Sequence, residues 1–377
     1  MKSKKHILFV TSNAGLYGAN TSMLNLMDKL NLDGFRTSVI VSAYGPLLQE
    51  LNKKKYTYKV IPFFGNYQKV GKPISKRDKL YNIAYNFALA KQNKDIITRW
   101  NVDVIHSNSS VSDFGPVLAK LTGKPHVWHI REMMEDDYNI EYVCPRLNKM
   151  LRNQSRKVIC ITEAVKEKNY GKKNKKNVEV IYNGFDIDNY LINKEEILNG
   201  NICNFLICGA VQEGKGQIYA VKMIDILVHK GITDVHLYVV GSGDADYTNE
   251  LKTYVKDKSI EDYVTFIAFT KNIQEIRKNI DIALVCSKNE ALGRVTIESM
   301  LGDILVIGAD SGGTAEIIQD RKTGYLYRPE DENDLAEKVI FALSHKEEVK
   351  AIVRQAKAYA KENFDSVKQT RKIEKIY

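Results

Sequence analysis

Two glutamates in one short segment have the residue type and spacing for ligand binding. Glu290 and Glu298 stand eight positions apart in "NEALGRVTIE", shortly after the apolar run "IDIALV". The pattern predicts a strand, then a loop with Glu290 at the strand's carboxyl end, then a helix that carries Glu298. Helical side chains lean toward the N-terminus, so Glu298 can point back toward the loop. The amides of Arg294 and Val295 open this helix and predict an anion site. Two carboxylates beside an anion site suit a ligand with phosphates and hydroxyls.

Two further loops also follow apolar runs and precede helices. "GADSGGTAEI" supplies Gly313 and Thr314, with a helix expected to start near Thr314, whose hydroxyl could cap that helix or contact a phosphate. "GAVQEGKGQ" begins at Gly209 and supplies Lys215, which could face a diphosphate. A tight turn and an exposed lysine are the ordinary alternatives. The second loop does not have the spacing of a phosphate-binding P-loop.

These loops are positioned by an alternation of β-rich runs and amphipathic stretches, which is typical of parallel α/β sheets. The chain has 377 residues, enough for two domains. Two such series predict an N-terminal doubly wound domain over 1–190 and a second over 202–364, joined by a polar linker over 191–201. A helix over 365–377 could return to cover the first domain. In such sheets ligands bind outside the carboxyl ends of the strands.

Composition limits the class of protein further. Apolar residues make up 44% and charged residues 27%, and no apolar run reaches the roughly 18 residues of a membrane span. The N-terminal apolar run "ILFV" is too short for a signal peptide, so we expect a cytoplasmic protein. The net charge of +10 is concentrated in part over 51–94, where lysines alternate with aromatic residues. Most such segments are solvated faces. The more specific interpretation is a surface that contacts anionic lipid. Binding to nucleic acid is the least favoured interpretation, because no binding motif is present.

The order of motifs along the chain resembles that of the family-4 retaining glycosyltransferases with the GT-B fold. The two glutamates fit the Glu-x7-Glu signature of that family, and "ADSGGTAEIIQDRKTGYLYRP" resembles the run that follows it. "VIYNGFD", "VDVIHSNS", "KPHVWHIRE" and "SNAGLYGANTSMLNL" resemble first-domain motifs, so the likeness spans nearly the whole chain. The resemblance implies two Rossmann-like doubly wound domains facing a central cleft, with the C-terminal helix returning to the first domain.

The resemblance also assigns roles to residues. Glu298 would hold the ribose hydroxyls of a nucleotide sugar, Glu290 would lie at the donor sugar, and Lys215 would neutralise the diphosphate. His129 would contact the transferring sugar as the second catalytic candidate. The remaining expected donor-binding positions are Gly18, Gly209, Arg294, Val295, Gly313 and Thr314.

Two motifs depart from the family's pattern. Ala210 follows Gly209 where the family usually has an arginine, and Arg294 is our hypothesised substitute for that missing cation. The first motif reads "YGAN" in place of "GGAE", which changes the acceptor side through Tyr17 and Asn20.

We therefore interpret the sequence as a retaining, metal-independent hexosyltransferase that needs no cofactor. Its expected partners are a nucleotide sugar donor and a saccharide or lipid-linked acceptor of surface polysaccharide assembly, and it could associate with the inner face of a membrane. A nucleotide-sugar epimerase and a non-catalytic subunit supporting a partner enzyme are the alternatives. Asp244 and Asp246 in "GDADY" could bind a metal, but a helix start is the simpler reading.

Overall fold

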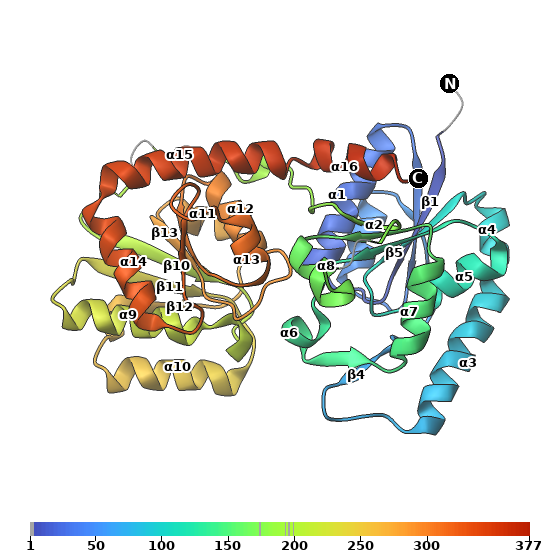
Figure 1. Ribbon diagram of the computed structural model, residues 1–377, viewed down its shortest axis with the longest axis horizontal. Coiled ribbons are helices and arrows are strands. Elements are labelled where there is room, and N and C mark those ends of the chain that lie inside the picture. The colour runs from blue at the N-terminus through green and yellow to red at the C-terminus, as the bar shows by residue number, and fades with distance from the viewer. Residues whose placement is uncertain (1–3, 173–174, 193, 195–196, 199) are drawn as a thin grey trace. The chain divides into compact units, whose positions relative to one another are not determined.

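The computed structural model describes residues 4–172, 175–192, 194, 197–198 and 200–377 (Figure 1). The chain divides into two compact units, Met1–Phe185 with Ser366–Tyr377, and Asp186–Asp365. The predicted linker 191–201 lies partly outside the described residues, at 193, 195, 196 and 199. Within that segment Ile197 and Leu198 are buried in the core of the second unit.

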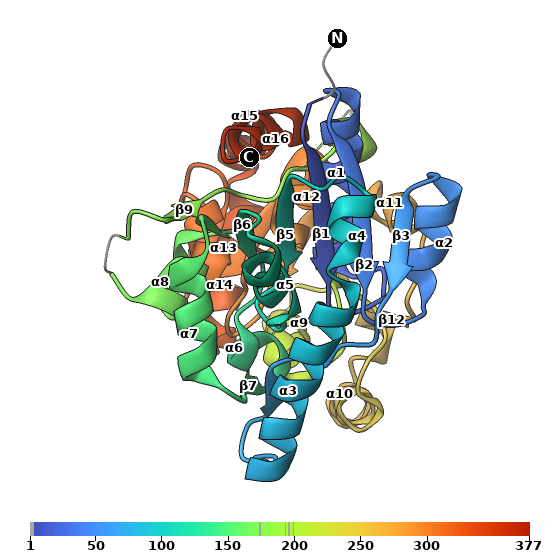
Figure 2. The ribbon, with the colours of Figure 1, turned by 90° about the vertical axis from the view of Figure 1, so that its right-hand side faces the viewer.

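The first unit is built on a seven-stranded parallel sheet (Figure 2). Its strands, in spatial order, are β3 (Thr57–Val60), β2 (Arg36–Val41), β1 (His6–Thr11), β5 (Val104–Asn108), β6 (His126–Ile130), β8 (Lys157–Cys160) and β9 (Val178–Val180). All seven fall on apolar runs that the sequence marks as strands. A separate antiparallel pair, β4 (Tyr67–Lys69) with β7 (Ile140–Tyr142), was not predicted.

Helices cover both faces of this sheet. They are α1 (Gly18–Leu32), α2 (Pro46–Lys53), α3 (Lys76–Asn93), α4 (Asp95–Arg99), α5 (Phe114–Thr122), α6 (Met134–Tyr138), α7 (Pro145–Gln154), α8 (Glu163–Tyr170) and α16 (Ser366–Glu374). Apolar side chains of α1, α2 and α16 pack on one face, and those of α4 and α5 pack on the other. The C-terminal helix α16 is thus part of the first unit.

The second unit is built on a six-stranded parallel sheet. Its strands, in spatial order, are β12 (Val264–Ile267), β11 (Val235–Val240), β10 (Cys203–Cys208), β13 (Ile282–Val285), β14 (Leu305–Ala309) and β15 (Tyr325–Tyr327). Its helices are α9 (Gln217–His229), α10 (Ala245–Asp257), α11 (Ile273–Arg277), α12 (Arg294–Leu301), α13 (Gly312–Ile317), α14 (Glu332–Ser344) and α15 (Lys346–Asn363).

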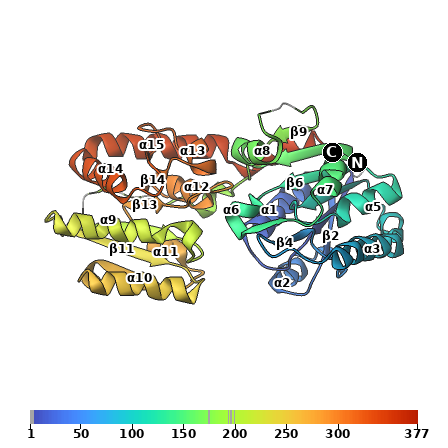
Figure 3. The same ribbon diagram turned by 60° about the horizontal axis from the view of Figure 1, so that its bottom comes forward.

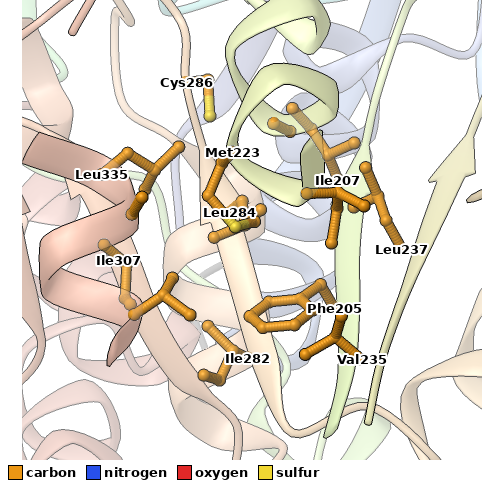
Figure 4. Packing of buried hydrophobic residues seen from close by; sticks show 14 of the residues in the cluster. Phe205, Ile207, Met223, Val235, Leu237, Ile282, Leu284, Cys286, Ile307 and Leu335 are labelled. Atoms are coloured by element: carbon orange, nitrogen blue, oxygen red, sulfur yellow. The ribbon is translucent and has the colours of Figure 1, made fainter. Parts of the chain in front are cut away.

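Alternation along β10 gives this sheet two buried faces. Phe205 and Ile207 point into the larger core with Met223 of α9 and Leu284 of β13 (Figure 4). Leu206 points to the opposite face, where α11 packs. Helices α9 and α14 lie side by side, and α10 lies against α9 (Figure 3). The sheet is therefore covered on both sides, and its loops remain to form a site.

Among the helices of the described residues, none combines the length and the apolarity needed to cross a bilayer.

Candidate functional site

The loop between β10 and α9 holds Lys215 beside the end of β13. Gly209 follows β10, and the loop closes with a 3-10 turn over Glu213–Lys215 and with Gly216 at a φ of +67°. A Cβ on Gly216 would lie 2.2 Å from the main-chain oxygen of Cys286. Glycine is the residue that tolerates both the positive φ and this close approach. It thereby fixes Lys215 next to the loop that carries Glu290.

Lys215 and Glu290 form an ion pair. Lys215 Nζ donates to Glu290 Oε1 at 2.7 Å, and Ser287 Oγ donates to the same oxygen at 2.7 Å. The lysine side chain is 25% exposed and the glutamate side chain 18%, so both remain accessible to a ligand. The structure thus brings together the predicted diphosphate cation and the predicted sugar-side carboxylate.

The glycine pair after β14 lets α13 approach the Glu290 loop. The amide of Gly313 donates to the main-chain oxygen of Glu290 at 2.6 Å. Gly312 has a φ of +50°, and a Cβ there would lie 2.1 Å from Asn289 Oδ1. The glycine pair therefore permits a close backbone approach to the neighbouring loop and holds that loop beside Lys215.

Thr314 does not cap its helix, which corrects one of the two roles expected for it. Helix α13 begins at Gly312, two residues earlier than expected, and Ser311 occupies the N-cap position. Thr314 is 1% exposed, and its hydroxyl has no hydrogen-bond partner among the described residues. The hydroxyl of Thr296, which is fully buried, has none there either. A Cβ on Gly293 would lie 3.1 Å from Thr296 Oγ1 and 3.4 Å from Thr314 Oγ1, so both hydroxyls lie near the start of α12.

Helix α12 starts as expected, with Arg294 and Val295 in its first turn. Gly293 is its N-cap residue, at a φ of +74°, and no side chain caps the helix. An eight-residue helix whose first amides receive no side-chain cap presents partial positive charge at its N-terminus. This arrangement is suited to binding an anion.

Glu298 lies between two arginines. Its Oε2 accepts from Arg277 at 2.5 Å and its Oε1 accepts from Arg294 at 3.2 Å. Arg294 also donates to the Tyr190 hydroxyl at 3.1 Å. Burial, followed by the charge of Glu298, raises the pKa of Tyr190. The Arg294 guanidinium, expected to replace the missing phosphate cation, is therefore engaged with Glu298 and Tyr190.

Arg277 was not found from the sequence. Its side chain is 1% exposed, and its Nε and one terminal nitrogen have no hydrogen-bond partner among the described residues. An arginine near the end of a short amphipathic helix usually points to solvent, so its sequence context gave no signal of burial. Two guanidiniums on one carboxylate leave an excess positive charge beside Glu298.

In the first unit, Gly18 is the first residue of α1, whose N-cap residue Tyr17 makes no side-chain cap. Asn20, where the family usually has glutamate, is buried and holds the β1–α1 loop. Its Nδ2 donates to the main-chain oxygens of Asn13 at 3.1 Å and Gly15 at 2.7 Å, and its Oδ1 accepts from Thr11 at 2.8 Å. Asn20 therefore has an architectural role, whereas Tyr17 is 73% exposed.

His129 lies near the end of β6 and is 1% exposed. Its Nδ1 lies 3.2 Å from a terminal nitrogen of Arg131 and 3.3 Å from His106 Nε2. Burial, followed by the charge of Arg131, lowers the pKa of His129 well below its usual value, so the ring is neutral. Its Nε2 has no hydrogen-bond partner among the described residues.

The Asp-x-Asp segment lies at the start of a helix, which is the simpler of the two interpretations of its sequence. Asp244 is the N-cap residue of α10, and its side chain accepts from the amides of Asp246 at 2.9 Å and Tyr247 at 3.1 Å. In the part of the chain that the structure describes, no group of three or more His, Cys, Asp or Glu side chains is arranged to hold a metal ion.

Comparison with known proteins places the chain in a family. Residues 17–189 match the model of Glycosyltransferase Family 4, and residues 192–359 match that of Glycosyl transferases group 1. The two matches together cover both parallel-sheet units. The chain belongs to the family-4 glycosyltransferases and has the GT-B fold.

Individual relatives agree with this assignment. The chain is 26% identical to N-acetyl-alpha-D-glucosaminyl L-malate synthase of Bacillus anthracis, over 78% of this chain and 79% of the relative. It is 28% identical to a glycosyltransferase of Methanocaldococcus jannaschii, over 79% and 82% of the two chains. Among solved structures, Anabaena Alr3699/HepE in complex with UDP superposes with a TM-score of 0.82 at 22% identity, over 99% of both chains. A glycosyltransferase of Rickettsia africae gives 0.80 at 22% identity, over 99% and 98%.

Proposed function

We propose that this protein is a retaining, metal-independent glycosyltransferase that moves a hexose-type sugar from a nucleotide diphosphate sugar to an acceptor hydroxyl. The observation that carries the proposal is the Lys215–Glu290 ion pair at the carboxyl ends of β10 and β13. It presents an accessible cation and an accessible carboxylate side by side, as a reaction that separates charge between phosphate and sugar requires.

The proposed chemistry depends on charge that develops as the bond between sugar and phosphate breaks. Negative charge grows on the diphosphate, where Lys215 and the first amides of α12 would stabilise it more strongly than in the ground state. Positive character grows on the sugar ring, which Glu290 would balance. Before reaction Lys215 is paired with Glu290, so the donor phosphate would exchange with or share that contact.

Glu298 remains able to bind ribose while it contacts both arginines. Each carboxylate oxygen has two lone pairs, and each accepts one guanidinium hydrogen bond from the arginines. One lone pair on each oxygen is left for a ribose hydroxyl. The excess positive charge of Arg277 and Arg294 would partly replace the arginine charge that is missing at Ala210.

The buried hydroxyls near Gly293 support a phosphate position at the start of α12. Unpartnered buried hydroxyls are costly, and a phosphate oxygen or a water would satisfy Thr296 and Thr314. Val295, Gly313 and Gly209 would contribute backbone contacts only.

The relatives suggest which donor to test first. Anabaena Alr3699/HepE was crystallised with UDP-glucose, and with UDP and glucose. We propose a UDP-sugar as donor for this chain, with no additional cofactor. For the acceptor we propose a saccharide or lipid-linked saccharide of surface glycan assembly; a Campylobacter jejuni relative, 27% identical over 42% of this chain, is named as acting on an undecaprenol-linked acceptor.

A face of the first unit would suit a lipid-linked acceptor. On α3 the side chains of Leu80, Tyr81 and Phe87 are 69%, 59% and 49% exposed. The same helix carries Lys76, Arg77, Lys79 and Lys91 against one acidic residue, Asp78. We propose that this face rests on anionic lipid at the cytoplasmic side of a membrane. Sedimentation with vesicles containing phosphatidylglycerol tests this, and absence of binding at low salt would contradict it.

The transferase function is tested by incubating the protein with UDP-, GDP- and dTDP-sugars and following nucleotide release, without added metal. Release from one donor should be lost in Lys215→Ala and Glu298→Ala and retained in Lys222→Ala. Lys222 is a matched control because its ion pair with Glu332 is similarly part-exposed and lies on α9 and α14. Donor binding without turnover under any acceptor would favour a non-catalytic subunit, and donor isomerisation without an acceptor would indicate an epimerase.

A further inference from the structure

A line of buried side chains runs from Tyr377, just beyond the end of α16, to the candidate catalytic histidine. The hydroxyl of Tyr377 lies 2.7 Å from His106 Nδ1, and His106 Nε2 lies 3.3 Å from His129 Nδ1. Tyr377, His106 and His129 are 4%, 0% and 1% exposed. All three belong to the first unit, so the line lies within one compact body.

The direction of each hydrogen bond follows from Arg131. A guanidinium has donors and no acceptor, so the contact between Arg131 and His129 Nδ1 requires an unprotonated Nδ1. Burial, followed by the charge of Arg131, lowers the pKa of both histidines well below the usual value, so both rings are neutral. His129 then carries its proton on Nε2. Two unprotonated nitrogens facing each other would repel, so His106 donates from Nε2 and shares the single lone pair of this Nδ1 with Arg131. The Nδ1 of His106 then accepts from the hydroxyl of Tyr377.

Arg131 is itself held in place. Its Nε donates to Asn108 Oδ1 at 2.7 Å, and a terminal nitrogen donates to Asn183 Oδ1. Asn183 lies in "NGFD". This segment resembles a first-domain motif of the family, and the resemblance assigned no role to Asn183. The arginine is therefore fixed by two asparagines from separate segments, and it can maintain its contact with the imidazole.

Tyr377 is anchored from several sides. Lys5 and Arg156 donate to its main-chain oxygen, Arg156 at 3.4 Å. The ring of Phe35 meets the Tyr377 ring edge-on at 6.2 Å between centroids. Phe9 contacts the His106 ring at 4.8 Å. These contacts restrict the tyrosine hydroxyl to the position facing His106.

The last atom of this line of side chains, His129 Nε2, is a hydrogen-bond donor. His129 lines a cavity of 20 Å³ together with residues of α1 and α16, among them Asn25 and Gln369, and with Asn183. Its Nε2 has no hydrogen-bond partner within the described part of the chain. A cavity of this volume holds one water-sized atom group.

We propose that Tyr377 and His106 are positioning residues that fix His129 as its Nε2–H tautomer, and thereby present a hydrogen-bond donor to an oxygen of the bound sugar or acceptor. The catalytic consequence rests on the transferase function proposed above. The tautomer and the hydrogen-bond directions do not.

The test is Tyr377→Phe, which removes one hydroxyl and keeps the ring. Long-range ¹H–¹⁵N correlation spectra of the histidine-labelled full chain report the protonated nitrogen of each ring, assigned with His106→Gln and His129→Gln. In wild type both rings should show the Nε2–H pattern, and in Tyr377→Phe the His106 signals should move toward a mixture. In the transfer assay kcat should fall about tenfold with KM for the donor nearly unchanged.

Tyr56→Phe is the control, since it deletes a different tyrosine hydrogen bond of the same unit, the part-buried one to Asp28 at 2.6 Å. It should alter neither the ring signals of His106 and His129 nor kcat. If Tyr377→Phe does not fold, two variants of His106 replace it. His106→Gln keeps a hydrogen-bond donor for His129, and His106→Leu does not. We therefore expect most of the kcat that is lost in His106→Leu to be present in His106→Gln. Unchanged histidine signals in folded Tyr377→Phe, or equal kcat in the two His106 variants, would overturn the proposal. A wild type that transfers no sugar would refute the proposed function, and the spectra would still decide the tautomers.

Discussion

Replacing Lys215 by alanine should damage activity far more than stability. In the free protein Lys215 Nζ forms an ion pair with Glu290 at 2.7 Å, and both side chains are part-exposed. A part-exposed ion pair contributes about 1 kcal/mol or less to the free energy of unfolding. Glu290 also keeps its hydrogen bond from Ser287 when the lysine is gone. We therefore expect Lys215→Ala to unfold at nearly the wild-type urea concentration.

The effect on transfer is larger because Lys215 would face charge that grows during the reaction. Two unit charges about 4 Å apart interact by about 4 kcal/mol at the effective dielectric constant of a protein surface. Part of this is already present in the contact with Glu290, so about 3 kcal/mol should be specific to the transition state. That corresponds to a fall of roughly a hundredfold in kcat/KM.

The assay is initial-rate nucleotide release with the donor found in the panel, alongside urea unfolding of the same samples. Lys222→Ala serves as the control and should keep its rate. If Lys215→Ala retained a third or more of the wild-type kcat/KM, the assignment of this lysine to the diphosphate would be wrong. If its free energy of unfolding were several kcal/mol lower than that of wild type, the lysine would be structural. The lower rate could then not be attributed to lost charge stabilisation.

Three predictions concern stability. Gly216→Ala should lower the free energy of unfolding by about 2 kcal/mol or more, because the new Cβ meets the Cys286 oxygen at a positive φ; a change under about 0.5 kcal/mol in urea unfolding would contradict this. Burial raises the pKa of Asp113 to about 6. Between pH values of about 4 and 6 the folded state holds a proton that the unfolded state has lost, so stability falls as pH rises, and wild type should lose about 3 kcal/mol relative to Asp113→Asn from pH 4 to pH 7. A difference that stays constant over this range would refute it. Asp244→Ala should cost about 1 kcal/mol through loss of the α10 cap, as measured by thermal unfolding, with donor release unchanged.

The sheets were predictable because parallel strands buried on both faces read as continuous apolar runs. Every strand of both large sheets coincides with a run marked in the sequence, and Lys215 and Glu290 meet because the ends of adjacent parallel strands share one edge. The antiparallel pair of β4 with β7 was missed, since Tyr67 and Tyr142 pair across a long sequence separation and each strand is only three residues long.

Contacts that depend on tertiary packing were also beyond the sequence. Arg277 reaches Glu298 from a different helix, and its burial is decided by the packing of α11 on the sheet. Likewise, the resemblance implies that His129 contacts the transferring sugar, and the structure adds that α1 and α16 cover this residue and leave one ring nitrogen beside a small cavity. The sequence motifs assigned a candidate role to His129 and none to Arg277, and only the fold supplied the partners of both residues.

The proposed reaction transfers a sugar with retained configuration at the anomeric carbon. It can be followed by ¹H NMR of the product formed from a UDP-α-sugar and an acceptor hydroxyl, in the presence of a metal chelator. We expect an α-linked product and free UDP, both absent with Glu298→Ala. A β-linked product, a requirement for added metal, or an isomerised donor in place of a glycoside would contradict it.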